Sequence, residues 1–263
     1  MENRHDIGRL LEILSRLRDP ESGCPWDRKQ DFRTILPYTL EEAYEVAEAI
    51  EEDDMDSLRG ELGDLLFQIA FHAQMAKEQG AFEFADVVET VCDKMVRRHP
   101  HVFAGVRYAD DAELRAAWER DKAEERVSQG AGGLLEGIAK TLPALVRAEK
   151  LQRRVARVGF DWDSAEGVIT KVREELDECE ETLEGGAGHN RRAEEIGDLL
   201  FSCVNLARHL GVDPEQALRA ASHRFERRFA FIEQGLRQRG EEPGADNREA
   251  MERLWEAAKR AED

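Results

Sequence analysis

The feature that most constrains this chain is an internal repeat. The pentapeptide Gly-Asp-Leu-Leu-Phe occurs at residues 63–67 and again at residues 197–201, an offset of 134 positions (197 − 63). Three further pairs keep the same order at nearly the same spacing: Glu-Glu-x-x-Glu at 41–45 and 174–178, Trp-Asp at 26–27 and 162–163, and Trp-x-x-x-Lys at 118–122 and 255–259. Self-similarity with a period close to half the chain predicts two tandem domains of common descent.

The boundary between the two domains is predicted from a glycine-rich stretch, Ser-Gln-Gly-Ala-Gly-Gly, at residues 128–133. Glycine-rich segments favour irregular, flexible connections. We therefore expect an N-terminal domain at residues 1–127, a linker at 128–135 and a C-terminal domain at 136–263. A chain of 263 residues is long enough for two domains that each bury a core.

Each half shows helical periodicity and helix-ending signals. Apolar residues recur every three or four positions around both pentapeptides, at Leu62, Leu65, Leu66 and Ile69 and at Ile196, Leu199, Leu200 and Val204. We expect Gly80 and Gly211 to end the central helices, and Asp213 to cap a helix that starts with Pro214. The pattern predicts an all-α fold of two tandem helical bundles with about four helices each. Broad apolar faces on such small bundles favour a homodimer.

The composition limits the classes of partner. The 57 acidic and 38 basic residues give a net charge of −19 at pH 7, which argues against binding a nucleic acid polymer through its phosphates. The N-terminus is polar and no apolar run approaches the roughly 20 residues of a membrane span, so we expect a cytoplasmic protein without a membrane partner. The four cysteines and seven histidines form neither Cys-x-x-Cys nor His-Glu-x-x-His, so zinc is not expected.

Carboxylates are predicted to cluster in each half. Residues three or four positions apart share one face of a helix, so Glu42 and Glu45 face the same way, as do Glu61 and Asp64 on the next helix. If the two helices pack, these side chains converge. The second half carries the same set in Glu174, Glu175, Glu178, Glu195 and Asp198. Converging carboxylates repel one another, and a hard divalent cation with oxygen ligands, Mg²⁺ first, relieves the repulsion.

Other interpretations of these acids stay open. In so acidic a chain, Glu-Glu-x-x-Glu also arises as an exposed helix surface, and Thr39 with Glu42 matches a capping box. The second copy argues against the capping box, because Glu175 should lie well inside a helix that begins near Asp163 or Ser164. A di-iron carboxylate bundle is not expected, because it needs Glu-x-x-His motifs and both halves have Glu-x-x-Glu and Glu-x-x-Asp instead.

Basic and aromatic residues follow the acids in both halves. The basic trios are Lys94, Arg97 and Arg98 in the first half and Arg224, Arg227 and Arg228 in the second. The first and last residues of each trio share a helix face that suits phosphate oxygens, although pairing with glutamates is an equal alternative. Trp118 and Trp255, each followed one turn later by Lys122 or Lys259, are candidates for stacking on a base. Packing in the core is the commoner role of such a tryptophan.

These motifs, together with Gly-Phe-Asp-Trp-Asp at residues 159–163, resemble the MazG family of all-α nucleoside triphosphate pyrophosphohydrolases. The likeness covers nearly the whole chain, including its tandem arrangement. It implies hydrolysis of a nucleoside triphosphate to the monophosphate and diphosphate by a dimeric helical protein that depends on Mg²⁺, with Mn²⁺ as a substitute.

The resemblance also implies roles for individual residues. The magnesium ligands would be Glu175, Glu178, Glu195 and Asp198, with Glu42, Glu45, Glu61 and Asp64 as their counterparts in the first half. The candidate nucleotide contacts are Lys171, Glu174, Arg191, Glu194, Arg224, Arg228, Trp255 and Lys259, with Lys94, Arg98, Trp118 and Lys122 in the first half. Glu174 is also a candidate for orienting the attacking water or the ribose.

The two halves differ in charge near the predicted sites. At the repeat offset, Lys171 corresponds to Tyr38 and Arg191 to Ser57, so the first half lacks two cations that would bind a triphosphate. We therefore expect the C-terminal site to be the more active one. Three roles stay open for the first half: metal binding, a different substrate, or support of assembly.

The expected mechanism is attack by a metal-activated water on the α-phosphorus, without a nucleophilic side chain and with relaxed preference for the base. The alternative function is a non-catalytic helical adaptor or regulator, in which the acids serve solubility and pairing.

Overall fold

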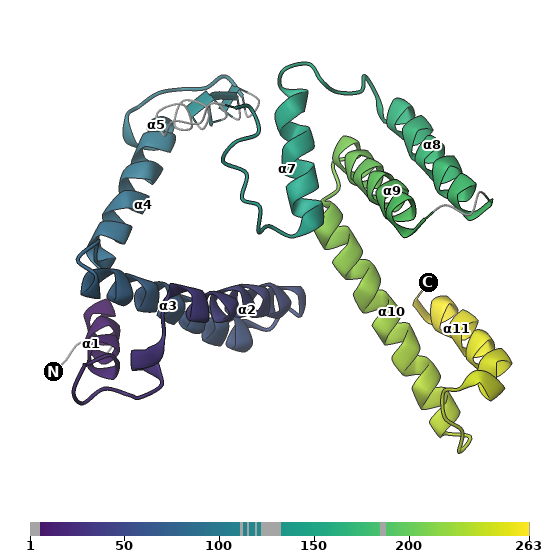
Figure 1. Ribbon diagram of the computed structural model, residues 1–263, viewed down its shortest axis with the longest axis horizontal. Coiled ribbons are helices and arrows are strands. Elements are labelled where there is room, and N and C mark those ends of the chain that lie inside the picture. The colour runs from purple at the N-terminus through teal and green to yellow at the C-terminus, as the bar shows by residue number, and fades with distance from the viewer. Residues whose placement is uncertain are drawn as a thin grey trace. The chain divides into compact units, whose positions relative to one another are not determined.

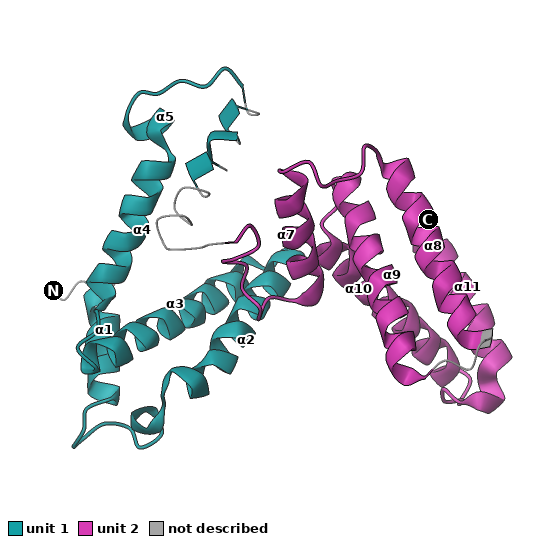
Figure 2. Cartoon of the chain, turned by 45° about the horizontal axis from the view of Figure 1, so that its top comes forward, with its two compact units in different colours: residues 1–121 teal, residues 122–263 magenta. Residues whose placement is uncertain are grey.

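The computed structural model describes residues 6–110, 113–114, 116–118, 120–121, 133–184 and 188–262. All regular elements in these ranges are helical, which confirms the predicted all-α fold. The chain divides into two compact units, residues 1–121 and 122–263 (Figure 2). Most of the linker predicted at residues 128–135 lies outside the described ranges. Over these same ranges, we find no helix with both the length and the apolar character needed to cross a bilayer.

Unit 1 is built on a pair of long helices. Its elements are α1 (Ile7–Leu17), the short 3₁₀ helix η1 (Asp27–Lys29), α2 (Phe32–Glu51), α3 (Met55–Glu78), α4 (Phe84–Arg98) and α5 (Pro100–Phe103). Helices α2 and α3 lie side by side and are joined by a short turn (Figure 1). The turn contains Asp53, whose φ of 56° is in the left-handed region. The pair is therefore antiparallel.

The start of α2 decides between two interpretations of the sequence. Asp31 caps the helix: its Oδ1 accepts hydrogen bonds from the backbone N–H groups of Arg33 and Thr34, and the Asp31 N–H donates to Thr34 Oγ1. Thr39 lies two turns further on, inside α2, where its hydroxyl is 2.9 Å from His72 Nε2. The capping-box alternative for Thr39 and Glu42 is therefore wrong, because the helix starts upstream of both residues.

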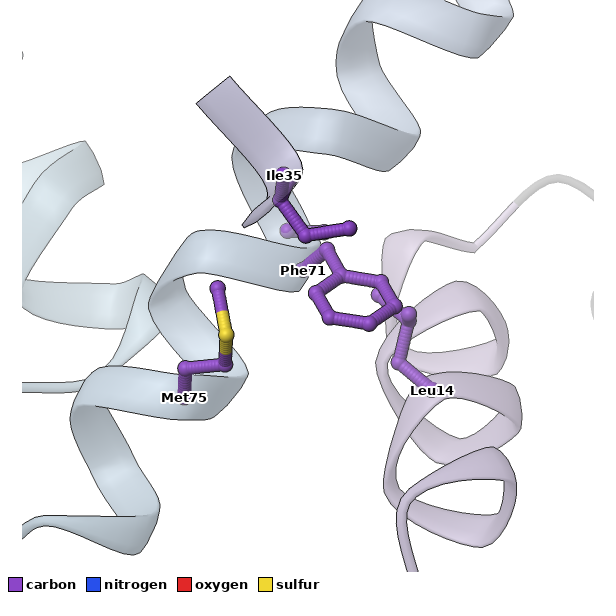
Figure 3. Close-up of a cluster of buried hydrophobic side chains, with 5 residues drawn as sticks. Leu14, Ile35, Phe71 and Met75 are labelled. Atoms are coloured by element: carbon purple, nitrogen blue, oxygen red, sulfur yellow. The ribbon is translucent and has the colours of Figure 1, made fainter. Parts of the chain in front are cut away.

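The core of unit 1 sets the register of the α2–α3 pair. Ile35 of α2 packs against Phe71 and Met75 of α3 and Leu14 of α1, and each of these side chains is at most 2% exposed (Figure 3). In an antiparallel pair, residue numbers on facing positions change in opposite directions. Pairing position 35 with position 71 therefore places position 42 opposite 64 and position 45 opposite 61.

Unit 2 repeats this helix pair. It contains α7 (Ala144–Ala156), α8 (Ala165–Glu184), α9 (His189–His209), α10 (Pro214–Arg237), η2 (Ala245–Asn247) and α11 (Arg248–Glu262). The four helices expected in this half correspond to α8, α9, α10 and α11, and α7 precedes them. The predicted punctuation is confirmed, since Gly211 follows α9 with a φ of 70° and Asp213 Oδ1 accepts a hydrogen bond from Gln216 N at the start of α10.

Two helix pairs organise unit 2. Helix α8 lies along α9, and α10 forms a hairpin with α11 (Figure 1). The hairpin has its own small core of Ile232, Leu236 and Ala250, against which Trp255 packs. The α8–α9 pair corresponds to α2–α3 of unit 1, and it carries the second Glu-Glu-x-x-Glu and Gly-Asp-Leu-Leu-Phe motifs.

Truncating Phe71 should destabilise unit 1 strongly. The Phe71→Ala change removes a fully buried ring and leaves a cavity, which typically costs about 3–5 kcal/mol. Urea unfolding should therefore show an earlier transition for unit 1. Phe103→Ala, at a position that is 59% exposed, is the matched control and should shift the transition little. Equal effects of the two changes would contradict the core assignment.

Candidate active site

The α8–α9 pair gathers the acids of unit 2 into one cluster. One oxygen from each of Glu175, Glu195 and Asp198 lies within 4.8 Å of the others. Glu175 is on α8, whereas Glu195 and Asp198 are three residues apart on α9. The unit 1 pair gathers Glu42, Glu61 and Asp64 in the same way. The convergence expected from the spacing is therefore present in both units.

The fourth acid of each set, Glu178 in unit 2 and Glu45 in unit 1, interacts with two acids of its cluster. Burial raises the pKa of the Glu178 carboxyl, and the negative charges of Glu175 and Glu195 raise it further. In unit 1, burial and the charges of Asp64 and Glu45 raise the pKa of Glu42. Glu61 follows the same pattern, since burial and then the charge of Glu45 raise its pKa. Each cluster therefore holds carboxylates that repel one another.

The donor set fits a hard divalent cation. All of the clustered groups are carboxylates, and hard cations such as Mg²⁺ take oxygen ligands. Unit 1 adds Gln68, a 7% exposed side chain that hydrogen-bonds to Glu42 and whose Oε1 has no partner among the described residues. A cation would offset the repulsion within either cluster.

Cations flank the unit 2 cluster. Lys171 Nζ is 2.7 Å from Glu174 Oε1 and 2.8 Å from Glu175 Oε1, and these hydrogen bonds raise its pKa. Arg191 Nε is 3.5 Å from Glu195 Oε1. In unit 1 the residue at the Lys171 position, Tyr38, instead contacts Trp26 edge-on with ring centroids 6.0 Å apart. Unit 2 thus combines clustered acids with positive charge.

A cavity of about 620 Å³ adjoins the unit 2 cluster. Lys171, Glu175 and Asp198 line one end of it, and Asn205 and Arg208 lie further along α9. Ten residues of helix separate Asp198 from Arg208, which corresponds to about 15 Å. Other parts of the wall come from α7 and from the segment between α7 and α8, including Gln152, Phe160 and Trp162. Most of this wall is apolar, as in pockets for small organic ligands.

An ion pair holds the α7–α8 segment against α9. Arg208 Nη1 donates to Asp161 Oδ2 at 3.0 Å, its Nη2 donates to Asp161 Oδ1, and His209 Nε2 is 3.0 Å from the same carboxylate. Next in the chain, Trp162 packs over Gly167, where an added Cβ would lie 3.1 Å from the indole ring. These contacts position Phe160 and Trp162 at the cavity.

Phe71 occupies the corresponding place in unit 1. Within the continuous helices α3 and α9, the pentapeptide offset of 134 aligns Phe71 with Asn205 and Gln74 with Arg208. Phe71 is fully buried in the unit 1 core. The space that adjoins the acids in unit 2 is therefore filled by a phenyl ring in unit 1.

Several candidate residues do not join either cluster within this chain. Arg228 and Trp255 contact each other on the α10–α11 hairpin, where Arg228 also pairs with Glu262 and Lys259 pairs with Glu256. Neither these residues nor the exposed Arg224 and Glu194 line the unit 2 cavity. Their roles in nucleotide binding stay predictions.

The corresponding residues of unit 1 show a packing role where they are described. Trp118 Nε1 donates to the carbonyl oxygen of Arg98 at 2.8 Å, and its ring contacts His99 edge-on. Lys94 is half-buried on α4, which leaves α3 at the end opposite its acids (Figure 1). Lys122 lies outside the described residues.

Sequence reasoning missed the polar groups of the cavity. Gln152, Asn205 and Arg208 belong to no motif, and each is ordinary on a helix. The signal that could have found two of them is a difference between the repeats, because Asn205 and Arg208 stand where the first half has Phe71 and Gln74.

Comparisons with known proteins identify the relatives of this chain. The MazG nucleotide pyrophosphohydrolase domain model matches residues 30–103. The chain is 51% identical over 259 residues to the nucleoside triphosphate pyrophosphohydrolase of Escherichia coli K12, covering 98% of each chain. It is 43% identical over 253 residues to the nucleoside triphosphate pyrophosphohydrolase/pyrophosphatase MazG of Thermotoga maritima, covering 95% of this chain and 94% of that protein. A crystal structure of a mazG-related protein from Thermotoga maritima aligns at 31% identity with 44% of this chain and 98% of its own, with a TM-score of 0.38.

The helical fold, the paired acid clusters and these relatives define an all-α hydrolase of phosphoric anhydride bonds. Within that class, the chain belongs to the MazG family of nucleotide pyrophosphohydrolases.

Removing the Asp161 carboxylate should change how stability depends on pH. Burial raises the pKa of Asp161, but hydrogen bonds from Arg208 and His209 outweigh it and bring the pKa to about 2, below the usual 3.8. The paired carboxylate therefore stabilises the fold above pH 3.8, and this contribution is lost as the pH falls towards 2. After allowance for solvent screening it is about 1 kcal/mol.

Asp161→Asn should therefore lower the free energy of unfolding at pH 6, and the difference from the native chain should shrink as the pH falls towards 2. Thermal unfolding between these pH values measures it, with Asp163→Asn as the control at a neighbouring exposed carboxylate. A difference that persists unchanged at low pH would contradict the ion-pair explanation.

Proposed function

We propose that this chain hydrolyses nucleoside triphosphates to the monophosphate and diphosphate at the unit 2 cluster, with Mg²⁺ bound there and Mn²⁺ as a substitute. The observation that carries the proposal is the convergence of Glu175, Glu195 and Asp198 at one end of a cavity of about 620 Å³. The printed names of the relatives from Escherichia coli and Thermotoga maritima support the reaction.

The residues of unit 2 have different roles in the proposed reaction. Glu175, Glu178, Glu195 and Asp198 would hold the cation, which when bound neutralises phosphate charge and lowers the pKa of a coordinated water. Lys171 and Arg191 supply positive charge to phosphate oxygens at the edge of the cluster. Glu174 is exposed and paired with Lys171, so it can orient the attacking water at the α-phosphorus. Such a site needs no nucleophilic side chain.

The differences between the two units at corresponding positions support unit 2 as the more active site. Unit 1 keeps the acids, but it has Tyr38 in place of Lys171 and a buried phenyl ring in place of Asn205. A metal ion fits the unit 1 cluster, whereas a nucleoside beside it would have to displace Phe71 from the core. Metal binding in support of assembly is therefore the role that we propose for unit 1.

Amide substitutions in the two clusters should separate their roles. Glu175→Gln removes one ligand charge in unit 2 and should lower kcat/KM for ATP with Mg²⁺ by about 100-fold or more. Glu42→Gln makes the same change in unit 1 and should leave most of the turnover. Phosphorus-31 NMR of the products should show AMP and diphosphate in the native reaction.

The control for a general loss of charge is Glu180→Gln, an exposed position on the same helix as Glu175. It should leave turnover unchanged. ADP and orthophosphate as products would overturn the choice of scissile bond. Retained turnover in Glu175→Gln would overturn the site, and no turnover of any triphosphate by the native protein would favour the adaptor alternative.

We also propose that the protein is a homodimer. Large apolar side chains stay exposed on the helix pair of unit 2: Leu176 is 48% exposed, Leu183 72%, Ile196 50% and Leu200 52%. Ile196 and Leu200 are one turn apart on α9, and Leu176 and Leu183 are two turns apart on α8, so each helix carries an apolar stripe. An exposed apolar face of this kind favours association, and a second copy of the chain is the partner that the family resemblance implies.

Leu200→Lys should weaken this dimer, because it places a charge on the apolar face. Sedimentation velocity should show a shift towards monomer over a range of micromolar concentrations, while the far-ultraviolet circular dichroism stays helical. Arg192→Ala, at an exposed polar position of the same helix, is the control. A native chain that sediments as a monomer at all these concentrations would contradict the proposal.

A further inference from the structure

The unit 2 cavity contains two side-chain amides whose orientations are set by their neighbours. Asn205 Oδ1 accepts hydrogen bonds from Arg208 Nε at 3.0 Å and Arg208 Nη2 at 2.8 Å. Gln152 Nε2 donates to the carbonyl oxygen of Phe201 at 2.8 Å. Both residues line the cavity. Because each amide has one end engaged, the other end is defined as well.

The free ends of the two amides are complementary. With its oxygen directed at Arg208, Asn205 presents its NH₂ group as a donor. With its nitrogen directed at Phe201, Gln152 presents Oε1 as an acceptor, and this atom is buried without a hydrogen-bond partner among the described residues. Gln152 is only 5% exposed, and a buried unpaired acceptor is unfavourable until a ligand supplies a donor.

We propose that this cavity binds the base of the nucleoside triphosphate, that Gln152 Oε1 accepts a hydrogen bond from the base and that Asn205 Nδ2 donates one to it. The inference rests on the function proposed above. Asp198 and Arg208 are about 15 Å apart along α9, so a ligand with its phosphates at the acids has its base near Asn205. Phe160 and Trp162, 78% and 47% exposed, supply aromatic faces for stacking at the same cavity.

This arrangement selects for the order of donor and acceptor on the base. On the Watson–Crick edge, adenine and cytosine carry an exocyclic amino donor beside a ring-nitrogen acceptor, whereas guanine and uracil carry an exocyclic carbonyl acceptor beside a ring N–H donor. Because the Gln152 acceptor and the Asn205 donor have fixed orientations, the site favours adenine and cytosine over guanine and uracil. Arg208, fixed by Asp161, keeps the Asn205 amide from rotating, so Asp161 and Arg208 act as positioning residues.

Two analogues of ATP test the two hydrogen bonds separately. Purine riboside triphosphate lacks the exocyclic amino group, and 1-deazaadenosine triphosphate lacks the N1 acceptor. For the native protein, each loss should lower kcat/KM by about three- to tenfold relative to ATP, the usual effect of one neutral hydrogen bond. Gln152→Leu should abolish the discrimination against the first analogue only, and Asn205→Leu against the second only.

A filled cavity gives a second measurement. Asn205→Phe introduces the residue that unit 1 has at this position, so it should raise KM for every nucleoside triphosphate at least tenfold. Binding of Mn²⁺, followed by electron paramagnetic resonance, should persist, because Glu175 and Asp198 are unchanged. Circular dichroism checks that each variant is folded.

The outcomes separate this inference from the function on which it rests. If Glu175→Gln retains full turnover, the proposed function fails. If Glu175→Gln is inactive but the native protein does not distinguish ATP from the two analogues, the assignment of the base to this cavity fails alone. The same conclusion holds if folded Asn205→Phe keeps the native KM.

Discussion

Repulsion among carboxylates, imposed by apolar packing, is the constraint on which the rest of the structure depends. The register that buries Ile35 against Phe71 brings Glu42 opposite Asp64, and neither helix can shift to separate the acids without exposing the core. Burial, and then the negative charges of Asp64 and Glu45, raise the pKa of Glu42. In unit 2 the same register places Val168 and Asn205 at the positions of Ile35 and Phe71, and Glu175 opposite Asp198. Each helix pair therefore carries a carboxylate cluster whose repulsion a bound cation would offset.

The two units show how a duplicated fold diverges in function. Both retain the acid cluster, so the difference lies in what adjoins it. In unit 1 a phenyl ring completes the core, whereas in unit 2 Asn205 leaves the space open and is itself held by Arg208 and Asp161. The larger side chain of Phe71 adds packing to the core of unit 1, and it fills the space that is a cavity in unit 2. This makes the second cluster part of a pocket and leaves the first as a cluster alone.

Much of the fold was accessible from local patterns, and much of the pocket was not. Periodicity predicted the helices. Gly211 correctly predicted the end of α9, and Asp213 with Pro214 correctly predicted the start of α10. A capping box at Thr39 was a wrong alternative for the start of α2, because Asp31 and Thr34 form the capping box two turns earlier. Trp118 was a candidate for base stacking, yet its indole N–H is used by the Arg98 carbonyl, a contact across 20 residues that no local pattern reveals.

The sequence by itself determined the duplication, the all-α class and the pairing of Glu42, Glu61 and Asp64 and their repeats, because these depend on spacing along helices and on one packed pair. Only the tertiary structure decided that α7 and the segment at residues 157–164 close a cavity beside the second cluster, and that the amides of Gln152 and Asn205 have fixed orientations. Those features depend on contacts between residues about 50 positions apart, such as Gln152 with Phe201 and Asp161 with Arg208, which periodicity does not encode.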